Sequence, residues 1–214
     1  MPATNPRKLL PRRRAFVRSV SGVSSQLFDT LLRVRVIGGS SRGRALEAPP
    51  VAESRPTSSR VREAIFDILG SRGGVEGLSV VDLFAGSGAL GIEALSRGAA
   101  AATFVEIDRR AVRSIEHNIA AVDLPEASTV VVRSDALDFC RGSSQQFDLA
   151  FCDPPYAFDD WQTLLRLVRA DRLVLESSLP PALPETLEAL RQYRYGGTLV
   201  TLVEARRAGA KGHA

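Results

Sequence analysis

The fold is decided by one stretch, VVDLFAGSGALG at residues 80–91. In it an apolar run leads directly into glycines spaced as G-x-G-x-x-G, which are Gly86, Gly88 and Gly91. This spacing, between a strand and the helix that it opens, is typical of a nucleotide-binding βαβ unit. The first glycine permits a tight turn, the second lets backbone approach a ligand, and the third lets helix and strand pack closely. The stretch therefore predicts an α/β fold with a ligand at this turn.

Strands and helices alternate beyond this turn. Apolar runs predict strands at residues 79–84, 102–105, 129–133, 147–152, 172–176 and 198–203, and helical spacing predicts helices at 90–96, 109–122, 161–168 and 185–192. Upstream, residues 34–37 and 44–48 predict a basic β-hairpin with a mobile tip, followed by a helix capped by Thr57 or Ser58. Gly196 and Gly197 predict a hairpin turn near the end. Together they predict a doubly wound sheet, parallel until an antiparallel terminal hairpin.

The charge of the 214-residue sequence is uneven. Its net charge is +4, made up of +6 in residues 1–33, +4 in residues 34–62 and −6 in residues 63–214. A basic balance points to a polyanionic partner, but here only the N-terminal part carries it. The only cysteines, Cys140 and Cys152, exclude a disulfide framework and a cysteine-rich zinc site and favour the cytoplasm, and we expect no metal. No apolar run is long enough for a membrane span.

Three parts are expected along the chain. Residues 1–33 form a basic, disordered extension, residues 34–74 a basic hairpin and helix packed on the core, and residues 75–214 the ligand-binding domain. We hypothesise that the native chain starts at Val34. Because Met1 is the only methionine, an internal start would use a Val or Leu codon, and at Val34 a GTG codon would be read as Met. A translated tail and an Arg-rich targeting segment are the alternatives for residues 1–33.

Two carboxylates select the ligand at the glycine turn. Glu106 ends the next strand, 20 residues after Gly86, where it can accept both ribose hydroxyls of a nucleotide. Asp82 lies at the tip of the first strand, where it would repel a pyrophosphate but suits the ammonium of a methionine moiety. This favours S-adenosylmethionine over a nicotinamide cofactor. Asp135 is a candidate for the adenine amino group, or else caps a helix, and Phe84 and Ala136 complete the predicted cofactor site.

A second motif, Asp153-Pro154-Pro155-Tyr156, follows the strand at residues 147–152. An exocyclic amine is a poor nucleophile because its lone pair is delocalised, so catalysis requires acceptors for its N–H groups. Asp153 and the carbonyl of Pro154 can supply them, and the prolines hold these oxygens in place. Tyr156 offers a flat face on which an extruded base can stack. The alternative is a simple turn after a strand.

These motifs, together with RPTSSRVREAIFDIL at residues 55–69 and FVEIDR at residues 104–109, resemble the RsmD family. That family consists of bacterial 16S rRNA guanine-N2 methyltransferases that use S-adenosylmethionine. The resemblance covers residues 34–203 and implies a Rossmann-like class I methyltransferase with a seven-stranded sheet. It also implies that the cofactor positions fall on Asp82, Gly86, Gly88, Glu106 and Asp135, and the base-binding tetrad on residues 153–156. The segment after Tyr156 is short for the family.

The leading hypothesis is methyl transfer to guanine N2 of 16S rRNA in an assembled or assembling small ribosomal subunit, by a monomeric cytoplasmic enzyme. The candidate phosphate contacts are Arg35, Arg42, Arg44, Arg60 and Arg62, for which a solvated basic face is the alternative reading. Other hypotheses are adenine-N6 or protein-amide methylation with the same tetrad, a nicotinamide oxidoreductase, and a non-catalytic ribosome-assembly factor.

Overall fold

The computed structural model describes residues 34–49, 58–122 and 128–206, and Arg33–Ala214 form one compact unit. The extension predicted at residues 1–33 lies outside the described residues, as does Thr57. Within the described ranges, no helix is both long and apolar enough to cross a bilayer. The same ranges contain no group of His, Cys, Asp and Glu side chains that could hold a metal ion.

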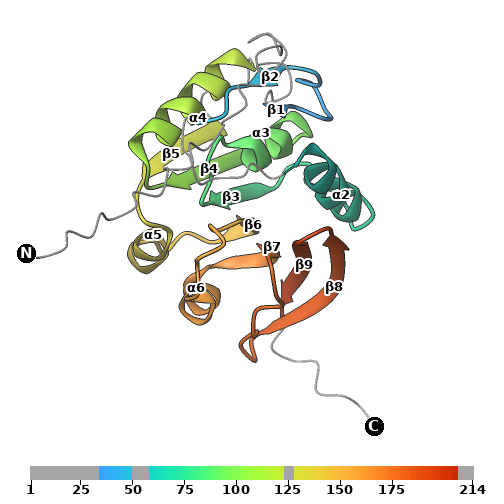
Figure 1. Cartoon of the computed structure of the whole chain (residues 1–214), viewed down its shortest axis with the longest axis vertical. Helices are drawn as coiled ribbons and strands as arrows, with labels where there is room; N and C mark the ends of the chain where they lie inside the picture. The colour runs from blue at the N-terminus through green and yellow to red at the C-terminus, as the bar shows by residue number, and fades with distance from the viewer. Residues whose placement is uncertain (1–33, 50–57, 123–127, 207–214) are drawn as a thin grey trace, which may run out of the picture. The chain divides into compact units, whose positions relative to one another are not determined.

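One sheet organises the unit (Figure 1). Its strands are β3 (Ser79–Leu83), β4 (Ala101–Glu106), β5 (Thr129–Arg133), β6 (Phe147–Cys152), β7 (Ala170–Ser177), β8 (Leu187–Tyr195) and β9 (Thr198–Ala205). Their order in space is β5-β4-β3-β6-β7-β9-β8. β9 is antiparallel to β7 and β8, whereas the other neighbours are parallel. The predicted fold class, a seven-stranded, mostly parallel sheet with an antiparallel terminal hairpin, is confirmed.

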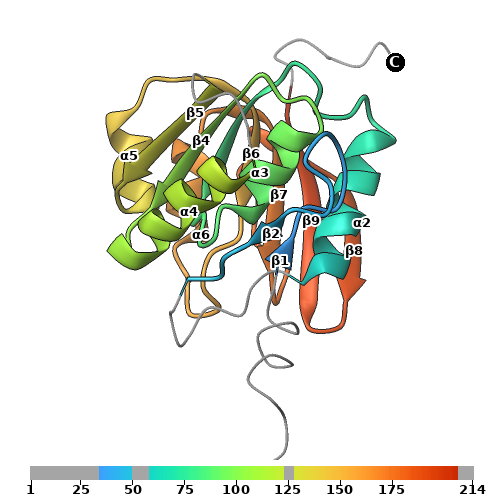
Figure 2. The same ribbon diagram turned by 90° about the horizontal axis from the view of Figure 1, so that it is seen from above.

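Helices cover both faces of the sheet (Figures 1 and 2). They are α2 (Ser59–Gly70), α3 (Ala89–Ser96), α4 (Arg109–Ala121), α5 (Ala136–Gly142) and α6 (Trp161–Leu167). Val80 of β3 packs in the core shared with α2, α3 and α4, and the next residue, Val81, packs in the core shared with α5 and α6. Because successive strand residues point to opposite faces, a central parallel strand buries both of them. This explains the uninterrupted apolar runs in the sequence.

The N-terminal hairpin is shorter than predicted, because only β1 (Val34–Arg35) and β2 (Ala45–Leu46) pair. Its tip, which the sequence predicted to be mobile, is hydrogen-bonded to the end of α3. Ser40 N donates to the carbonyl of Ser96 over 2.8 Å, and Ser41 N donates to Ser96 Oγ over 2.9 Å. A Cβ added at Gly39 would lie only 1.7 Å from the Ser96 oxygen. Backbone-to-backbone contact therefore fixes the tip.

The helix predicted at residues 185–192 is wrong, because these residues lie in and before β8. Glu, Leu, Ala, Arg and Gln are strong helix formers, which gives the segment a high intrinsic helix propensity. Pairing with β9 overrides this helix propensity. The pairing contains one irregularity, a register shift between Ala189 and Arg191. The turn predicted after β8 is confirmed, with Gly196 in the left-handed region at φ 61°.

Candidate active site at the strand ends

Three carboxylates gather where β4, β3 and β6 end side by side. Asp82 of β3 lies opposite Phe104 of β4 on one side and Phe151 of β6 on the other. Glu106 ends β4, and Asp153 directly follows β6. The chain passes from β3 to β4 on one side, whereas β6 lies on the other, so this is the topological switch point of the sheet. Open α/β sheets bind their ligands at such a point, outside the carboxyl ends of the strands.

Asp82 is buried, with 1% of its surface exposed. Its side chain accepts a hydrogen bond from Gly91 N of α3 over 3.0 Å. Burial raises the pKa of this carboxyl well above its ordinary value, and Asp153 and Glu106 raise it further. A site that crowds negative charge in this way favours a cationic ligand, which would relieve the repulsion. The ammonium of S-adenosylmethionine fits this requirement.

Glu106 holds the glycine loop. One of its carboxylate oxygens accepts from Gly86 N and the other from Asp108 N, each over 2.8 Å. A carboxylate has about four lone-pair positions, so capacity for two ribose hydroxyls remains. Gly86 and Gly88 adopt left-handed φ values of 56° and 75°, as expected for a tight turn.

The remaining predicted cofactor residues have observed packing roles. A Cβ added at Gly91 would lie 2.3 Å from the Phe104 ring, so helix and strand are in the close contact that the glycine spacing predicted. Phe84 has a positive φ of 63°, and its ring packs edge-on against Phe158 with centroids 5.2 Å apart. Asp135 caps α5 by accepting from Leu137 N and Asp138 N, and Ala136 is buried. Contact of these residues with a cofactor stays a prediction.

The tetrad forms the loop after β6. Asp153 is half-buried, Pro154 is buried, and the Tyr156 side chain is 66% exposed. The carbonyl of Pro155 accepts from Phe158 N over 2.8 Å, which closes the turn. Phe158 also packs edge-on against Trp161, so these aromatic rings support the loop from the core. The Tyr156 ring is thus accessible for stacking, three residues after the half-buried Asp153.

Ile107 is a further candidate site residue that sequence reasoning did not consider. It directly follows Glu106 at the end of β4 and is 61% exposed. An exposed apolar side chain beside a carboxylate can contact the face of a base while the carboxylate binds the ribose. The signal in the sequence was that Ile107, an apolar residue, follows Glu106, the polar residue that ends the apolar run of β4.

Four of the five arginines predicted to contact phosphate are exposed, namely Arg35, Arg42, Arg44 and Arg60. Arg35 also donates to the carbonyl of Gly43 over 2.9 Å, within the hairpin. Exposed guanidinium groups such as these can contact phosphate, and contact of these four residues with RNA stays a prediction.

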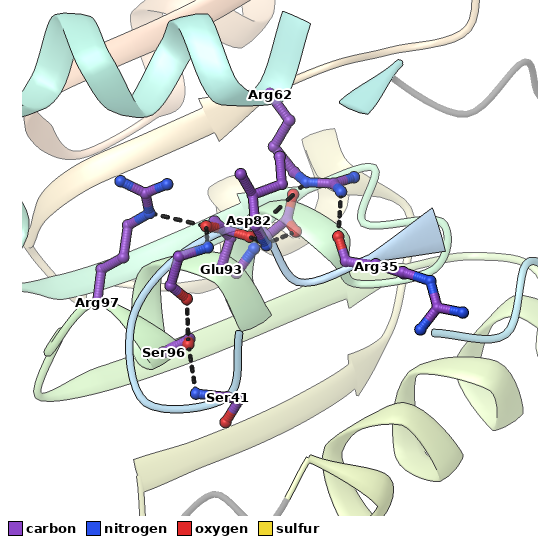
Figure 3. A network of polar contacts seen from close by, with 10 residues as sticks. Arg35, Ser41, Arg62, Asp82, Glu93, Ser96 and Arg97 are labelled. Atoms are coloured by element: carbon purple, nitrogen blue, oxygen red, sulfur yellow. Dashed lines mark hydrogen bonds and ion pairs between the residues drawn. The ribbon is translucent and has the colours of Figure 1, made fainter. Parts of the chain in front are cut away.

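The prediction for Arg62 is wrong, because its side chain is fully buried between α2, α3 and the hairpin (Figure 3). Its guanidinium donates to the carbonyl of Arg35 and lies 3.9 Å from a carboxylate oxygen of Glu93, which is also fully buried. Burial lowers the pKa of Arg62, although the negative charge of Glu93 opposes the shift. Arg62 anchors α2 in the core, together with Val61 and Ile65 on the same helix face.

Glu93 of α3 is the centre of this polar network (Figure 3). It accepts from Ile37 N over 2.7 Å, from Gly38 N over 2.8 Å and from Arg97 Nε over 2.7 Å. A buried carboxylate with three donors and a nearby second cation is well compensated for its desolvation. The network therefore ties the N-terminal hairpin to the helix that follows the glycine loop.

Comparison with known proteins agrees with this arrangement. The family model described as Conserved hypothetical protein 95 matches residues 34–204. YlbH of Bacillus subtilis is 36% identical over 186 residues, which cover 81% of this chain and all of YlbH. Ribosomal RNA small subunit methyltransferase D of Escherichia coli is 41% identical over 124 residues, which cover 58% of this chain and 61% of that protein.

Among solved structures, yhhF from Escherichia coli is similar with a TM-score of 0.73 and 33% identity, covering 82% of this chain and 99% of that one. The fold, the glycine loop, the strand-end carboxylates and the family match all lead to one assignment. The chain belongs to the RsmD family of S-adenosylmethionine-dependent class I methyltransferases.

Proposed function

We propose that this protein transfers the methyl group of S-adenosylmethionine to the exocyclic N2 of a guanine in 16S rRNA, with the base extruded into a pocket formed by residues 153–156. Methylation of rRNA in general follows from family membership and from the name of the relative ribosomal RNA small subunit methyltransferase D. The substrate is the 16S rRNA of an assembled or assembling small subunit, and the enzyme acts as a monomer in the cytoplasm.

The observation that carries the proposal is the cluster of three carboxylates, those of Asp82, Glu106 and Asp153, beside the glycine loop. These residues fit the cofactor. Asp82 is desolvated and lies near two other carboxylates, so its charged form would be stabilised by a neighbouring ammonium. Glu106 would hold the ribose, and Ile107 and Asp135 the adenine. When bound, S-adenosylmethionine supplies an electrophilic methyl carbon on a sulfonium.

Asp153 is the proposed catalytic residue. Its carboxylate would accept an N2–H of guanine and stabilise the positive charge that develops on this nitrogen as it takes up the methyl group. The same carboxylate would then accept the proton that the methylated nitrogen must lose and release it to solvent. The Pro154 carbonyl accepts the second N–H. Positioning of the amine, rather than a covalent intermediate, then supplies the rate enhancement.

The neighbouring thiol does not fit a covalent route. Cys152 is buried beside Asp153, and burial raises its pKa well above the ordinary value, with Asp82 and Asp153 adding to the shift. The thiol is therefore protonated at neutral pH, whereas nucleophilic attack on a base requires a thiolate. This supports direct displacement.

Binding of the target is divided between stacking and phosphate contacts. The exposed Tyr156 ring can stack on the extruded base, a contact of about 1–3 kcal/mol per base. The exposed arginines of the hairpin, Arg42 and Arg44, would contact phosphates and position the RNA without reading its sequence.

The test is transfer of tritiated methyl groups to small subunits, free 16S rRNA and DNA in parallel, followed by identification of the modified nucleoside. We expect N2-methylguanosine in 16S rRNA. Label in adenine, DNA or protein would replace the proposed target with one of those substrates, and absence of transfer with RNA binding retained would indicate an assembly factor. Stabilisation of the protein by NAD instead of S-adenosylmethionine would indicate an oxidoreductase.

The proposed role of Asp153 is tested by Asp153→Ala, with Asp159→Ala as the matched control. Asp159 is an exposed carboxylate six residues further on, outside the tetrad. We expect Asp153→Ala to abolish transfer with cofactor affinity retained, and Asp159→Ala to transfer normally. Wild-type turnover in Asp153→Ala would refute the role.

A further inference from the structure

Asn118 of α4 makes a three-way connection. Its side chain is fully buried. The side-chain oxygen accepts from Glu47 N over 2.7 Å, and the side-chain nitrogen donates to the carbonyls of Glu47 and Ser87, each over 2.9 Å. Both amide protons and the oxygen are therefore used, which offsets the cost of burying this polar group.

This amide stands on the buried face of α4. Its buried neighbours there are Ala111, Ser114, Ile115 and Ile119, of which Ile115 and Ile119 pack in the main core. Asn118 is the largest polar side chain on this face. The amide fixes the backbone of two segments that are 71 and 31 residues away in the sequence.

The two segments belong to different parts of the proposed site. Ser87 lies between Gly86 and Gly88 in the glycine loop, next to the Gly86 N–H that Glu106 holds. Glu47 directly follows β2, the second strand of the hairpin that presents Arg42 and Arg44. Asn118 thus spans the cofactor loop and the RNA-binding hairpin.

A second connection runs in parallel through α3 (Figure 3). At its start, Gly91 N donates to Asp82, and further along, Glu93 and Ser96 hold the hairpin backbone. The hairpin is therefore fixed to the cofactor machinery at two places. Among the interactions of residues 34–49, 58–122 and 128–206, only those of Asn118 join the hairpin segment to a carbonyl of the glycine loop itself.

We infer that Asn118 is a positioning residue that makes cofactor and RNA binding cooperative. Asn118 makes these bonds in the described structure, so bound RNA would act by keeping them closed. RNA on the hairpin holds Glu47 against α4, which keeps Asn118 on the Ser87 carbonyl and suppresses opening of the glycine loop before the cofactor arrives. The first ligand to bind loses free energy in ordering the loop. The second ligand then binds a loop that is already ordered, so the second ligand binds more tightly. The inference rests on the proposed function, because it needs both ligands to bind.

The test is the affinity for radiolabelled S-adenosylhomocysteine, measured by equilibrium dialysis with and without saturating small ribosomal subunits that carry unmethylated 16S rRNA. Allosteric couplings are typically about 5- to 150-fold. We expect subunits to raise the affinity at least about fivefold in the wild type, and S-adenosylhomocysteine to raise subunit affinity by the same factor. In Asn118→Ala we expect both factors to fall to about one.

His117→Ala is the matched control. His117 is the neighbouring residue on α4, is largely exposed, and has Nε2 3.6 Å from a carboxylate oxygen of the same Glu47. It has no contact with the glycine loop among the interactions of the described residues, so this variant should keep the wild-type factor. An unchanged factor in Asn118→Ala, or a factor of one in a wild type that binds both ligands, would overturn the inference. A wild type that does not bind one of the ligands would overturn the proposed function and this inference with it.

A measurement on the wild type alone covers the case in which Asn118→Ala does not fold. In the cofactor-free protein, we expect unmethylated subunits to slow hydrogen exchange of the amides at residues 86–91 at least about fivefold. Exchange that is unchanged at these amides while the hairpin amides become protected would overturn the inference.

Discussion

Gly91→Ala tests the contact between α3 and β4 on which the glycine loop rests. The added Cβ would lie 2.3 Å from Phe104 Cε1, 2.9 Å from Cζ and 3.0 Å from Cδ1. Carbon atoms that are not bonded normally stay about 3.5–4.0 Å apart. Phe104 is fully buried in the central core, so its ring cannot swing away.

Two opposing effects set the magnitude. Overpacking of a filled core costs about 1–3 kcal/mol, and an overlap of this depth belongs at the upper end. Replacing glycine by alanine inside a helix returns about 1 kcal/mol. We therefore expect a net loss of about 2 kcal/mol in the free energy of unfolding. For a chain of this size, that corresponds to a fall in melting temperature of about 4–8 °C.

Thermal unfolding followed by circular dichroism measures this effect, with Gly142→Ala as the control. Gly142 ends α5, and nothing lies within 4 Å of its added Cβ, so we expect a melting temperature equal to or slightly above the wild-type value. Because Gly91 N also donates to Asp82, displacement of α3 should weaken S-adenosylhomocysteine binding in Gly91→Ala alone. A Gly91→Ala protein that melts at or above the wild-type temperature would refute the packing argument.

Three further predictions concern charge. The pKa of Asp82 is raised by burial, so the folded protein holds this proton more tightly than the unfolded chain does, and the contribution of Asp82 to stability is lost as pH rises through the folded-state pKa. Urea unfolding at several pH values should therefore show the stability of Asp82→Asn rising relative to that of the wild type as pH rises. The same variant should bind the cofactor more weakly. A stability difference that does not vary with pH would contradict this prediction. Glu93→Ala leaves Arg62 buried without its carboxylate and should cost about 3–5 kcal/mol in urea unfolding, whereas a loss below about 1 kcal/mol would show that the network is dispensable. Arg42→Ala with Arg44→Ala should weaken subunit binding and reduce the slope of log affinity against log salt by about 2, and an unchanged slope would remove these residues from the phosphate contacts.

The central parallel strands β3, β4 and β6 were predictable because they are buried on both faces. The bounds predicted for β5 and β6 are those observed, because a polar residue stands on each side of both runs. β8 was not predictable in the same way. It is an edge strand in which Leu187 is buried but most other residues are exposed, so burial leaves little pattern and helix propensity dominates.

The position of Asp82, Glu106 and Asp153 at neighbouring strand ends was predictable, because each lies in or directly after an apolar run that forms a strand. Arg62 was misassigned because a charged side chain suggests exposure, although its spacing from Ile65, Phe66 and Leu69 places it on the buried face of α2. Asn118 gave a comparable signal, because its spacing from Ala111, Ile115 and Ile119 places it on the buried face of α4. Its partners could not be inferred, because they are brought to it only by the tertiary fold.

The contact of Gly39 with the end of α3 has a consequence for engineering new substrate preferences. A tip that rests on the Ser96 carbonyl, with no room for even a methyl group, is matched to one particular helix end. A foreign hairpin grafted onto this catalytic core would therefore lack the backbone contacts with the end of α3 that hold the native tip. The transferable module is the hairpin together with α3 and the Asn118 position of α4, and a chimaera built on that larger exchange should keep both its stability and its methyl-transfer chemistry.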